Sequence, residues 1–220
     1  FNFIASHDGI GLRPTEGILT DNERSTLMNI IKDFGGEISY RRKSDNSESV
    51  YELNIALIDA MKGTFKGIDH MQTERFIAAH AIMLSLEGIP AFYIHSVIGT
   101  SNDYELVKKT KNKRSINRKS WNYEDIDKRL SDSKSQNFVI YNNLKKLIEI
   151  RKKQSAFHPN ATQFTFNLGP NFFGIWRQSL DKKQSIFSIT NVSNVFQYLD
   201  LSELNLIESN EWWDLISNEI

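Results

Sequence analysis

The segment that most constrains the fold is the first one, FNFIASHDGIG. It is typical of an apolar strand over residues 1 to 5 that leads directly into His7, Asp8 and Gly9. In sheets of parallel strands, an acidic residue that follows the carboxyl end of a strand typically belongs to a functional site. The chain has no initiator Met at position 1, and a core strand with nothing before it would leave an unpaired edge. We therefore expect a fragment of a longer protein whose N-terminal part is missing.

Composition excludes several function classes. The 27 basic residues equal the 27 acidic residues, which argues against long-range attraction to nucleic acid or to an anionic membrane. The chain has no Cys, so disulfides and thiolate metal sites are excluded. It shows neither a secretory leader nor an apolar run of about 18 residues. The sequence therefore predicts a cytoplasmic protein. Its apolar residues make up 40% of the chain, which is enough to build a core.

The first half of the chain alternates between strand and helix signals. Thr20 can cap a helix that begins at Asp21 and ends at Gly35-Gly36. A polar insert then resembles a surface lid, with a short strand at Glu37–Arg41 and a turn near residues 44 to 49. Further elements are expected in this order: helical spacing over 53–61, an apolar helix over 71–86 closed by Gly88, and a buried strand over 89–94.

The second half begins with a long polar stretch. Residues 99 to 136 are rich in Lys, Asn, Ser and Asp, and a loop of this length is usually functional or disordered; we favour a functional loop. An amphipathic helix follows over about 138–154. Apolar and polar residues then alternate in the runs 163–166, 172–176, 185–189, 196–199 and 211–216, which predicts a small antiparallel β domain.

This order of elements predicts an α/β fold: the last part of a (β/α)8 barrel over residues 1–157, followed by an antiparallel β domain over 158–220. Whether the β domain is itself truncated stays open. Three stretches carry a family resemblance: FNFIASHDGIG, YELNIALIDAM and EGIPAFYIHSVIGTSNDYELVKKTKNKRSINRKSW. The chain resembles the α-amylase superfamily, glycoside hydrolase family thirteen. Within it, the likeness is to the sucrose phosphorylase branch, and above all to its glucosylglycerate and glucosylglycerol phosphorylases.

The resemblance implies a retaining glucosyl transfer from an α-glucoside to inorganic phosphate, with no cofactor and no metal. In this family the nucleophilic Asp and the acid/base Glu come from earlier barrel strands, which precede residue 1. Asp8 matches the acid that stabilises the oxocarbenium-like transition state. The fragment alone is therefore expected to be inactive. The Asp-Gly dipeptide alone favours an ordinary turn, and it is the matches around it that favour the catalytic role of Asp8.

Five further residues are candidates for substrate binding through the same resemblance. His7 and Arg114 match residues that hold hydroxyls of the glucosyl unit, and Tyr51 matches a mobile tyrosine that meets phosphate. Glu52 stands where sucrose phosphorylases tend to carry an amide, and a carboxylate suits the hydroxyls of a glyceryl group. Arg13 could pair with a glycerate carboxylate or with phosphate. The alternatives are a rim aromatic for Tyr51 and a solvated basic loop for Arg114.

Other hypotheses also remain. The same residues fit a related hydrolase that uses water, or a non-catalytic carbohydrate-binding module. His70 and His80 fit core or capping roles better than metal binding, and Trp212-Trp213 fits the core of the β domain. We also expect self-association through strand edges exposed at the two ends.

Overall fold

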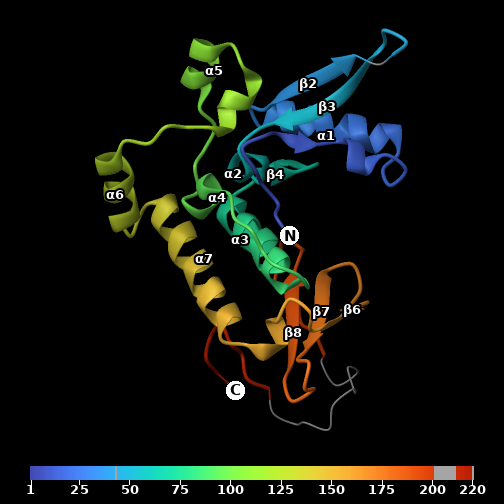
Figure 1. Cartoon of the computed structure of the whole chain (residues 1–220), viewed down its shortest axis with the longest axis vertical. Helices are drawn as coiled ribbons and strands as arrows, with labels where there is room; N and C mark the ends of the chain where they lie inside the picture. The colour runs from blue at the N-terminus through green and yellow to red at the C-terminus, as the bar shows by residue number, and fades with distance from the viewer. Residues whose placement is uncertain (43, 201–211, 220) are drawn as a thin grey trace. The chain divides into compact units, whose positions relative to one another are not determined.

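The structure is a computed structural model that describes residues 1–42, 44–200 and 212–219 (Figure 1). The chain divides into two compact units. One unit contains Phe3–His80 and Ala91–Leu144, and the other contains Phe1–Asn2, Ala81–Pro90 and Lys145–Ile220.

An antiparallel sheet and one helix begin the first of these units. The sheet has the strand order β1 (Ile10–Gly11), β3 (Glu48–Asn54) and β2 (Glu37–Arg42). The helix is α1 (Asp21–Asp33), whose N-terminus is closed by a capping box between Thr20 and Glu23. This confirms the predicted helix cap at Thr20 and the end of the helix before Gly35-Gly36. It also confirms the predicted strand after the two glycines. A 3-10 turn, η1 (Arg13–Thr15), joins β1 to this helix.

Alternation along β3 separates a core face from a polar face of the sheet. Leu53 points into a cluster with Leu12, Ile31, Phe34, Ile38 and Ile55, all at most 4% exposed. Glu52 and Asn54 flank Leu53 and lie on the opposite face, where the Asn54 amide donates to Glu52 Oε2 over 3.2 Å. The predicted helical spacing over 53–61 is therefore wrong at its start, because strand pairing takes Leu53 and Asn54, and helix α2 spans only Leu57–Ala60.

A second apolar cluster lies between α2 and two longer helices. Helix α3 (Gln72–Ser85) provides Phe76, and α7 (Gln136–Lys152) provides Ile140 and Leu144; together they pack against Ala56, Leu57 and Ile58. A short hairpin of β4 (Gly63–Thr64) and β5 (Gly67–Ile68) precedes α3. His80 is 1% exposed and stacks with Phe92 at 5.9 Å between ring centroids, which confirms its core role.

The polar stretch over 99–136 is folded into short helices, so the expectation of a long loop is wrong. After α4 (Ile94–Val97) come α5 (Tyr104–Thr110), the 3-10 helix η2 (Lys113–Asn117) and α6 (Tyr123–Ser131). The side chains of Asp103, Asn112 and Asn122 each accept a backbone N–H at the start of one of these helices. The polar residues that resembled a loop thus act as helix N-caps. Within the described residues, no helix combines the length and apolar character needed to cross a membrane.

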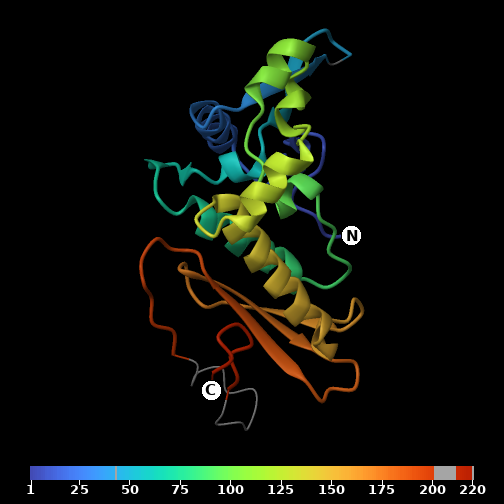
Figure 2. The ribbon, with the colours of Figure 1, turned by 90° about the vertical axis from the view of Figure 1, so that its left-hand side faces the viewer.

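The second unit contains a three-stranded antiparallel sheet in the region where the sequence predicts a β domain. Strands β6 (Thr162–Phe166), β7 (Phe172–Gln178) and β8 (Ser185–Asn191) pair in this order after the turn η3 (Ser155–Phe157), and are drawn in orange in Figure 2. Arg177 on β7 is fully buried and donates to backbone carbonyls, namely those of Ser85, His158, Ala161 and Thr162. Buried cations of this kind need such acceptors.

Two other expected strands of the β domain do not form. Residues 196–199 lie outside any strand, and Phe196 and Tyr198 are largely exposed. Residues 212–219 form a turn closed by the bridge between Asp214 and Glu219, and Glu211 lies outside the described residues. An alternating pattern makes a strand only where a neighbouring strand accepts its hydrogen bonds. The Trp212 ring packs against Phe187 at 4.8 Å, as expected for the core, whereas Trp213 is 53% exposed.

The two expected barrel strands, residues 1–5 and 89–94, are reduced to one parallel bridge between Asn2 and Pro90. Asn2 N donates to Ile89 O over 2.9 Å, but Pro90 has no amide hydrogen and cannot extend the ladder. Phe1 is 89% exposed, and Ile94 begins α4. Buried parallel strands need paired neighbours, and within the described residues neither segment belongs to a sheet, although Ile4 and Ala5 do pack against the apolar cluster of α2, α3 and α7. Mixed α/β structure with antiparallel sheets is what the chain shows.

Candidate active site

The polar face of β3 holds a buried carboxylate with a matched cation. Glu52 is 4% exposed, yet both of its oxygens contact one guanidinium: Arg114 Nε donates to Oε2 at 2.9 Å and Nη2 donates to Oε1 at 2.7 Å. Two parallel hydrogen bonds of this kind fix the plane of the guanidinium. These hydrogen bonds raise the pKa of Arg114 above its usual value. The strand therefore determines the direction in which Arg114 points.

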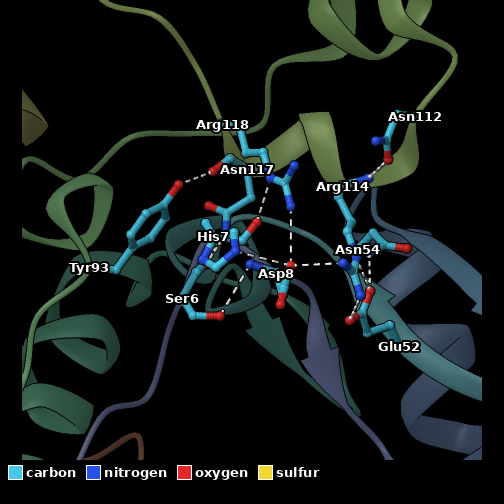
Figure 3. A network of polar contacts seen from close by, with 10 residues as sticks. All are labelled: Ser6, His7, Asp8, Glu52, Asn54, Tyr93, Asn112, Arg114, Asn117 and Arg118. Carbon is cyan, nitrogen blue, oxygen red and sulfur yellow. Dashed lines mark hydrogen bonds and ion pairs between the residues drawn. The ribbon is translucent and has the colours of Figure 1, made fainter.

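Arg114 lies in η2, whose geometry is set by its own sequence. The side chain of Asn112 accepts the Arg114 backbone N–H at 3.0 Å and caps the helix. Asn117, at the end of η2, is nearly buried and receives at its carbonyl a hydrogen bond from the Tyr93 hydroxyl over 2.6 Å. One 3-10 helix thus places Arg114 and Asn117 near the segment that contains Asp8 (Figure 3).

The His-Asp segment is held by its backbone. Asn117 Nδ2 donates to Ser6 O at 2.7 Å, and Arg118 Nε donates to His7 O at 2.8 Å. The Asp8 N–H donates to Ser6 Oγ at 3.2 Å. Gly9 then runs so close to β3 that a Cβ would lie 2.6 Å from Leu53 O, so only glycine fits there.

Three nitrogen-bearing side chains approach a single oxygen of Asp8. Asp8 Oδ1 lies 3.0 Å from Arg114 Nη1, 3.1 Å from Arg118 Nη2 and 3.5 Å from His7 Nε2. The Asp8 side chain is 37% exposed. Glu52 and Asp8 balance the charges of Arg114 and Arg118, so a neutral ligand meets a preorganised network without net charge.

A pocket of about 300 Å³ lies beside Asp8. Asp8, Ser6 and Asn117 are among its polar residues, and the apolar lining comes from Phe3, Ile4, Ala5, Ile10, Pro14, Ile55 and Leu57. An apolar hollow with a small number of polar groups at its edge is the usual form of a small-molecule site.

The structure therefore brings together four of the six predicted site residues: His7, Asp8, Glu52 and Arg114 (Figure 3). Tyr51, which precedes Glu52, is 42% exposed at a break in the pairing of β2 with β3, where Ser39 faces Glu52 but Tyr40 faces Val50. Bulges of this kind re-aim side chains near functional sites.

Arg13 lies elsewhere in this unit, where it begins η1 and is exposed; the contacts of the network described above do not include it.

Sequence reasoning missed Arg118, Asn117 and Asn54. Arg118 lies in a basic stretch that resembles a solvated loop, although RSINR places it four residues after Arg114. The stretch consists of Lys108, Lys109, Lys111, Lys113, Arg114, Arg118 and Lys119. Three lysines of that stretch have other partners: Lys108 pairs with Glu105, Lys113 lies 3.8 Å from Glu37, and Lys119 lies over the Trp121 ring. In the described part of the chain, no group of three or more His, Cys, Asp or Glu side chains could hold a metal ion.

Three proteins that are similar to this chain in sequence or in structure are phosphorylases. The chain is 34% identical over all of its 220 residues to the glucosylglycerate phosphorylase of Escherichia coli K12, and 36% identical over 198 residues to that of Spirochaeta thermophila. It spans 39% and 33% of these two relatives. The crystal structure of sucrose 6F-phosphate phosphorylase from Thermoanaerobacter thermosaccharolyticum matches 83% of the chain and 34% of that protein, with a TM-score of 0.67 and 26% identity. No protein-family model matches.

The chain is therefore homologous to the sucrose-type phosphorylases of the α-amylase family, as the resemblance in its sequence implied. More particularly, its homologues are glucosylglycerate phosphorylases and sucrose phosphorylases, and it aligns with the C-terminal fraction of them.

Proposed function

We propose that the chain forms the glucose-holding side of a retaining glucoside phosphorylase, which transfers a glucosyl unit from an α-glucoside to inorganic phosphate. In this proposal the nucleophile and the general acid come from a part of the enzyme that precedes Phe1. Residues 1–157 close a (β/α)8 barrel and residues 158–220 form its C-terminal β domain. The parallel bridge between Asn2 and Pro90 supports this, because parallel pairing is the pairing of barrel strands.

The observation that carries the proposal is the position of Asp8. Arg114 and Arg118 both bind Oδ1, beside a pocket of about 300 Å³. A fixed carboxylate can accept hydroxyl hydrogen bonds that strengthen as positive charge grows at the anomeric carbon. Asp8 then stabilises the transition state more than the ground state. His7, 68% exposed and next to Asp8, is free to turn toward the same sugar.

Arg114 and Glu52 act as one unit in this mechanism. The Arg114 side chain is a third exposed and can donate to distant hydroxyls of the glucose ring. Glu52 fixes the plane of the Arg114 guanidinium. Because Glu52 is almost completely buried and both of its oxygens are engaged, contact with an acceptor hydroxyl requires one of these bonds to open. Tyr51 and Arg13, both exposed, are the residues that would meet phosphate or the carboxylate of an acceptor.

The names of the relatives favour glucosylglycerate as the substrate, with glucosylglycerol and sucrose-type glucosides as the alternatives. Each of these relatives is named a phosphorylase, which supports transfer of the glucosyl unit to inorganic phosphate. That no cofactor takes part belongs to the same proposal. The cytoplasmic location and the self-association expected from the sequence belong to the same proposal.

The test uses the polypeptide of the complete reading frame. It is offered phosphate with glucosylglycerate, glucosylglycerol, sucrose or sucrose 6F-phosphate, and glucose 1-phosphate is measured. Asp8→Asn should lower kcat by about 10²- to 10³-fold, whereas Asp125→Asn on α6 should leave it unchanged. Release of free glucose in place of glucose 1-phosphate would favour the hydrolase. Absence of turnover with all four glucosides would contradict the proposal.

The 220 residues alone provide a second test. They should be inactive on every substrate, because a stabilising carboxylate cannot replace a nucleophile and an acid. Turnover by this chain alone would refute the proposal that the nucleophile and the general acid come from the part of the enzyme that precedes Phe1.

A further inference from the structure

Arg118 makes two contacts that converge on the same dipeptide. Its Nε donates to the carbonyl oxygen of His7 at 2.8 Å, and its Nη2 donates to Asp8 Oδ1 at 3.1 Å. The two partners are consecutive residues, 111 and 110 positions away in the sequence. A guanidinium has donors in a rigid fork, so holding both partners fixes the Asp8 side chain relative to its own backbone.

The contacts also leave the two oxygens of Asp8 unequal. Arg114, Arg118 and His7 all approach Oδ1. Among the described residues, Oδ2 accepts no hydrogen bond from the protein. Since the carboxylate is 37% exposed, Oδ2 is the oxygen that remains for a ligand hydroxyl. Rotation about the Cβ–Cγ bond would exchange the two oxygens, and the contacts to Oδ1 oppose it.

Neighbouring residues show that Arg118 itself is held in place. The Asn117 side chain donates to Ser6 O at 2.7 Å, and the Asn117 carbonyl accepts the Tyr93 hydroxyl at 2.6 Å. The consecutive side chains of Asn117 and Arg118 therefore donate hydrogen bonds to the consecutive carbonyls of Ser6 and His7. Arg114 differs because its other contacts go to Glu52 and not to the backbone of the His-Asp segment.

We infer that Arg118 is a positioning residue, which orients Oδ2 of Asp8 toward the substrate without touching the substrate itself. This inference rests on the proposed function. Its signature is a loss of kcat with little change in KM, since orientation of a transition-state contact affects the reacting complex more than ground-state binding. Truncation of Arg114, which is proposed to contact sugar hydroxyls, should instead raise KM as well.

The kinetic experiment compares Arg118→Ala, Arg118→Lys and the neighbouring control Lys119→Ala in the polypeptide of the complete reading frame. Arg118→Ala should lower kcat by about 10- to 100-fold, the equivalent of losing a charge-assisted hydrogen bond, with KM changed by less than about threefold. Added guanidinium ion should restore part of kcat. Arg118→Lys should be intermediate, because one ammonium cannot make both contacts. Lys119→Ala removes a charge one residue away and should behave as the unchanged enzyme.

Full activity of Arg118→Ala in an enzyme that does release glucose 1-phosphate would overturn the inference while leaving the proposed function intact. Equal activity of Arg118→Lys and the unchanged enzyme would overturn the two-point geometry. A second readout does not depend on turnover: in NMR spectra of the polypeptide of the complete reading frame, Asp8→Asn should shift the Nε–Hε signal of Arg118. An Arg118 signal unmoved by Asp8→Asn would show that the contact is not made, and would refute the inference even if the enzyme acts on another substrate.

Discussion

The pair formed by Glu52 and Arg114 can be tested by a nearly isosteric change, Glu52→Gln. Arg114 donates two hydrogen bonds to Glu52, at 2.9 and 2.7 Å. A bond to a charged group contributes about 1.5 to 3 kcal/mol and a neutral one about 0.5 to 1.5 kcal/mol. Glutamine retains one neutral acceptor and turns an N–H2 group toward the guanidinium, so one bond weakens and the other is lost.

Arg114 is a third exposed, so water replaces part of what is lost. The net loss in the free energy of unfolding should then be about 2 kcal/mol. For a chain of 220 residues this corresponds to a decrease in Tm of about 4 to 8 °C. Glu48→Gln at the exposed start of β3 is the matched control and should change the free energy of unfolding by less than about 0.5 kcal/mol.

Urea denaturation followed by tryptophan fluorescence measures the effect, with the m value unchanged. A double-mutant cycle with Arg114→Met isolates the pair, and its coupling energy should be about 1 to 2 kcal/mol. The reasoning would be refuted if Glu52→Gln were as stable as the unchanged chain, or if the two substitutions were additive. Either result would mean that the carboxylate at β3 does not hold Arg114.

Three further stability predictions concern other parts of the molecule. Arg177→Met should lower the free energy of unfolding by more than about 3 kcal/mol, because it leaves several buried carbonyls without a donor; a loss below about 1 kcal/mol in urea would contradict this. Burial lowers the pKa of His80, so the unfolded chain binds the proton more tightly and stability should decrease as pH falls below about 6.5. His80→Leu should make that decrease shallower between about pH 6.5 and 5, and an unchanged slope would exclude His80 as its source. Gly35→Ala should cost about 1 to 3 kcal/mol, since φ is +89° and the new Cβ would collide with the Tyr104 hydroxyl. Gly17→Ala, with φ +80° in open space, should cost less, and equal losses would show that the collision is relieved.

Local signals in the sequence predicted the elements that depend on neighbouring residues. Thr20 and Glu23 close the N-terminus of α1 through a side chain and a backbone three positions apart, so the signal is complete within one turn. The alternating runs of β6, β7 and β8 were recognisable because each strand pairs with its neighbour in sequence. Helices α5 and α6 have a local signal of the same kind, because Asp103 and Asn122 are their N-caps.

Patterns that need distant partners were misjudged. Residues 89–94 have the composition of a buried strand, but Pro90 stops the ladder after a single bridge to Asn2. Residues 53 and 54 have helical spacing, yet pairing with Glu37 and Ile38 makes them part of β3. In each case, the hydrogen-bond partner and not the pattern decided the outcome.

The sequence by itself determined which chemical groups are present: an Asp behind an apolar segment, a carboxylate within YELN and two arginines within RSINR. Tertiary structure decided how they are paired. Arg114 meets Glu52 from 62 residues away, and Arg118 meets Asp8 from 110 residues away. A charge chooses its partner by distance in space and by shared burial, and neither can be obtained from spacing along the chain. That is why Arg118 resembled surface charge in the sequence and became a contact of Asp8 only in the fold.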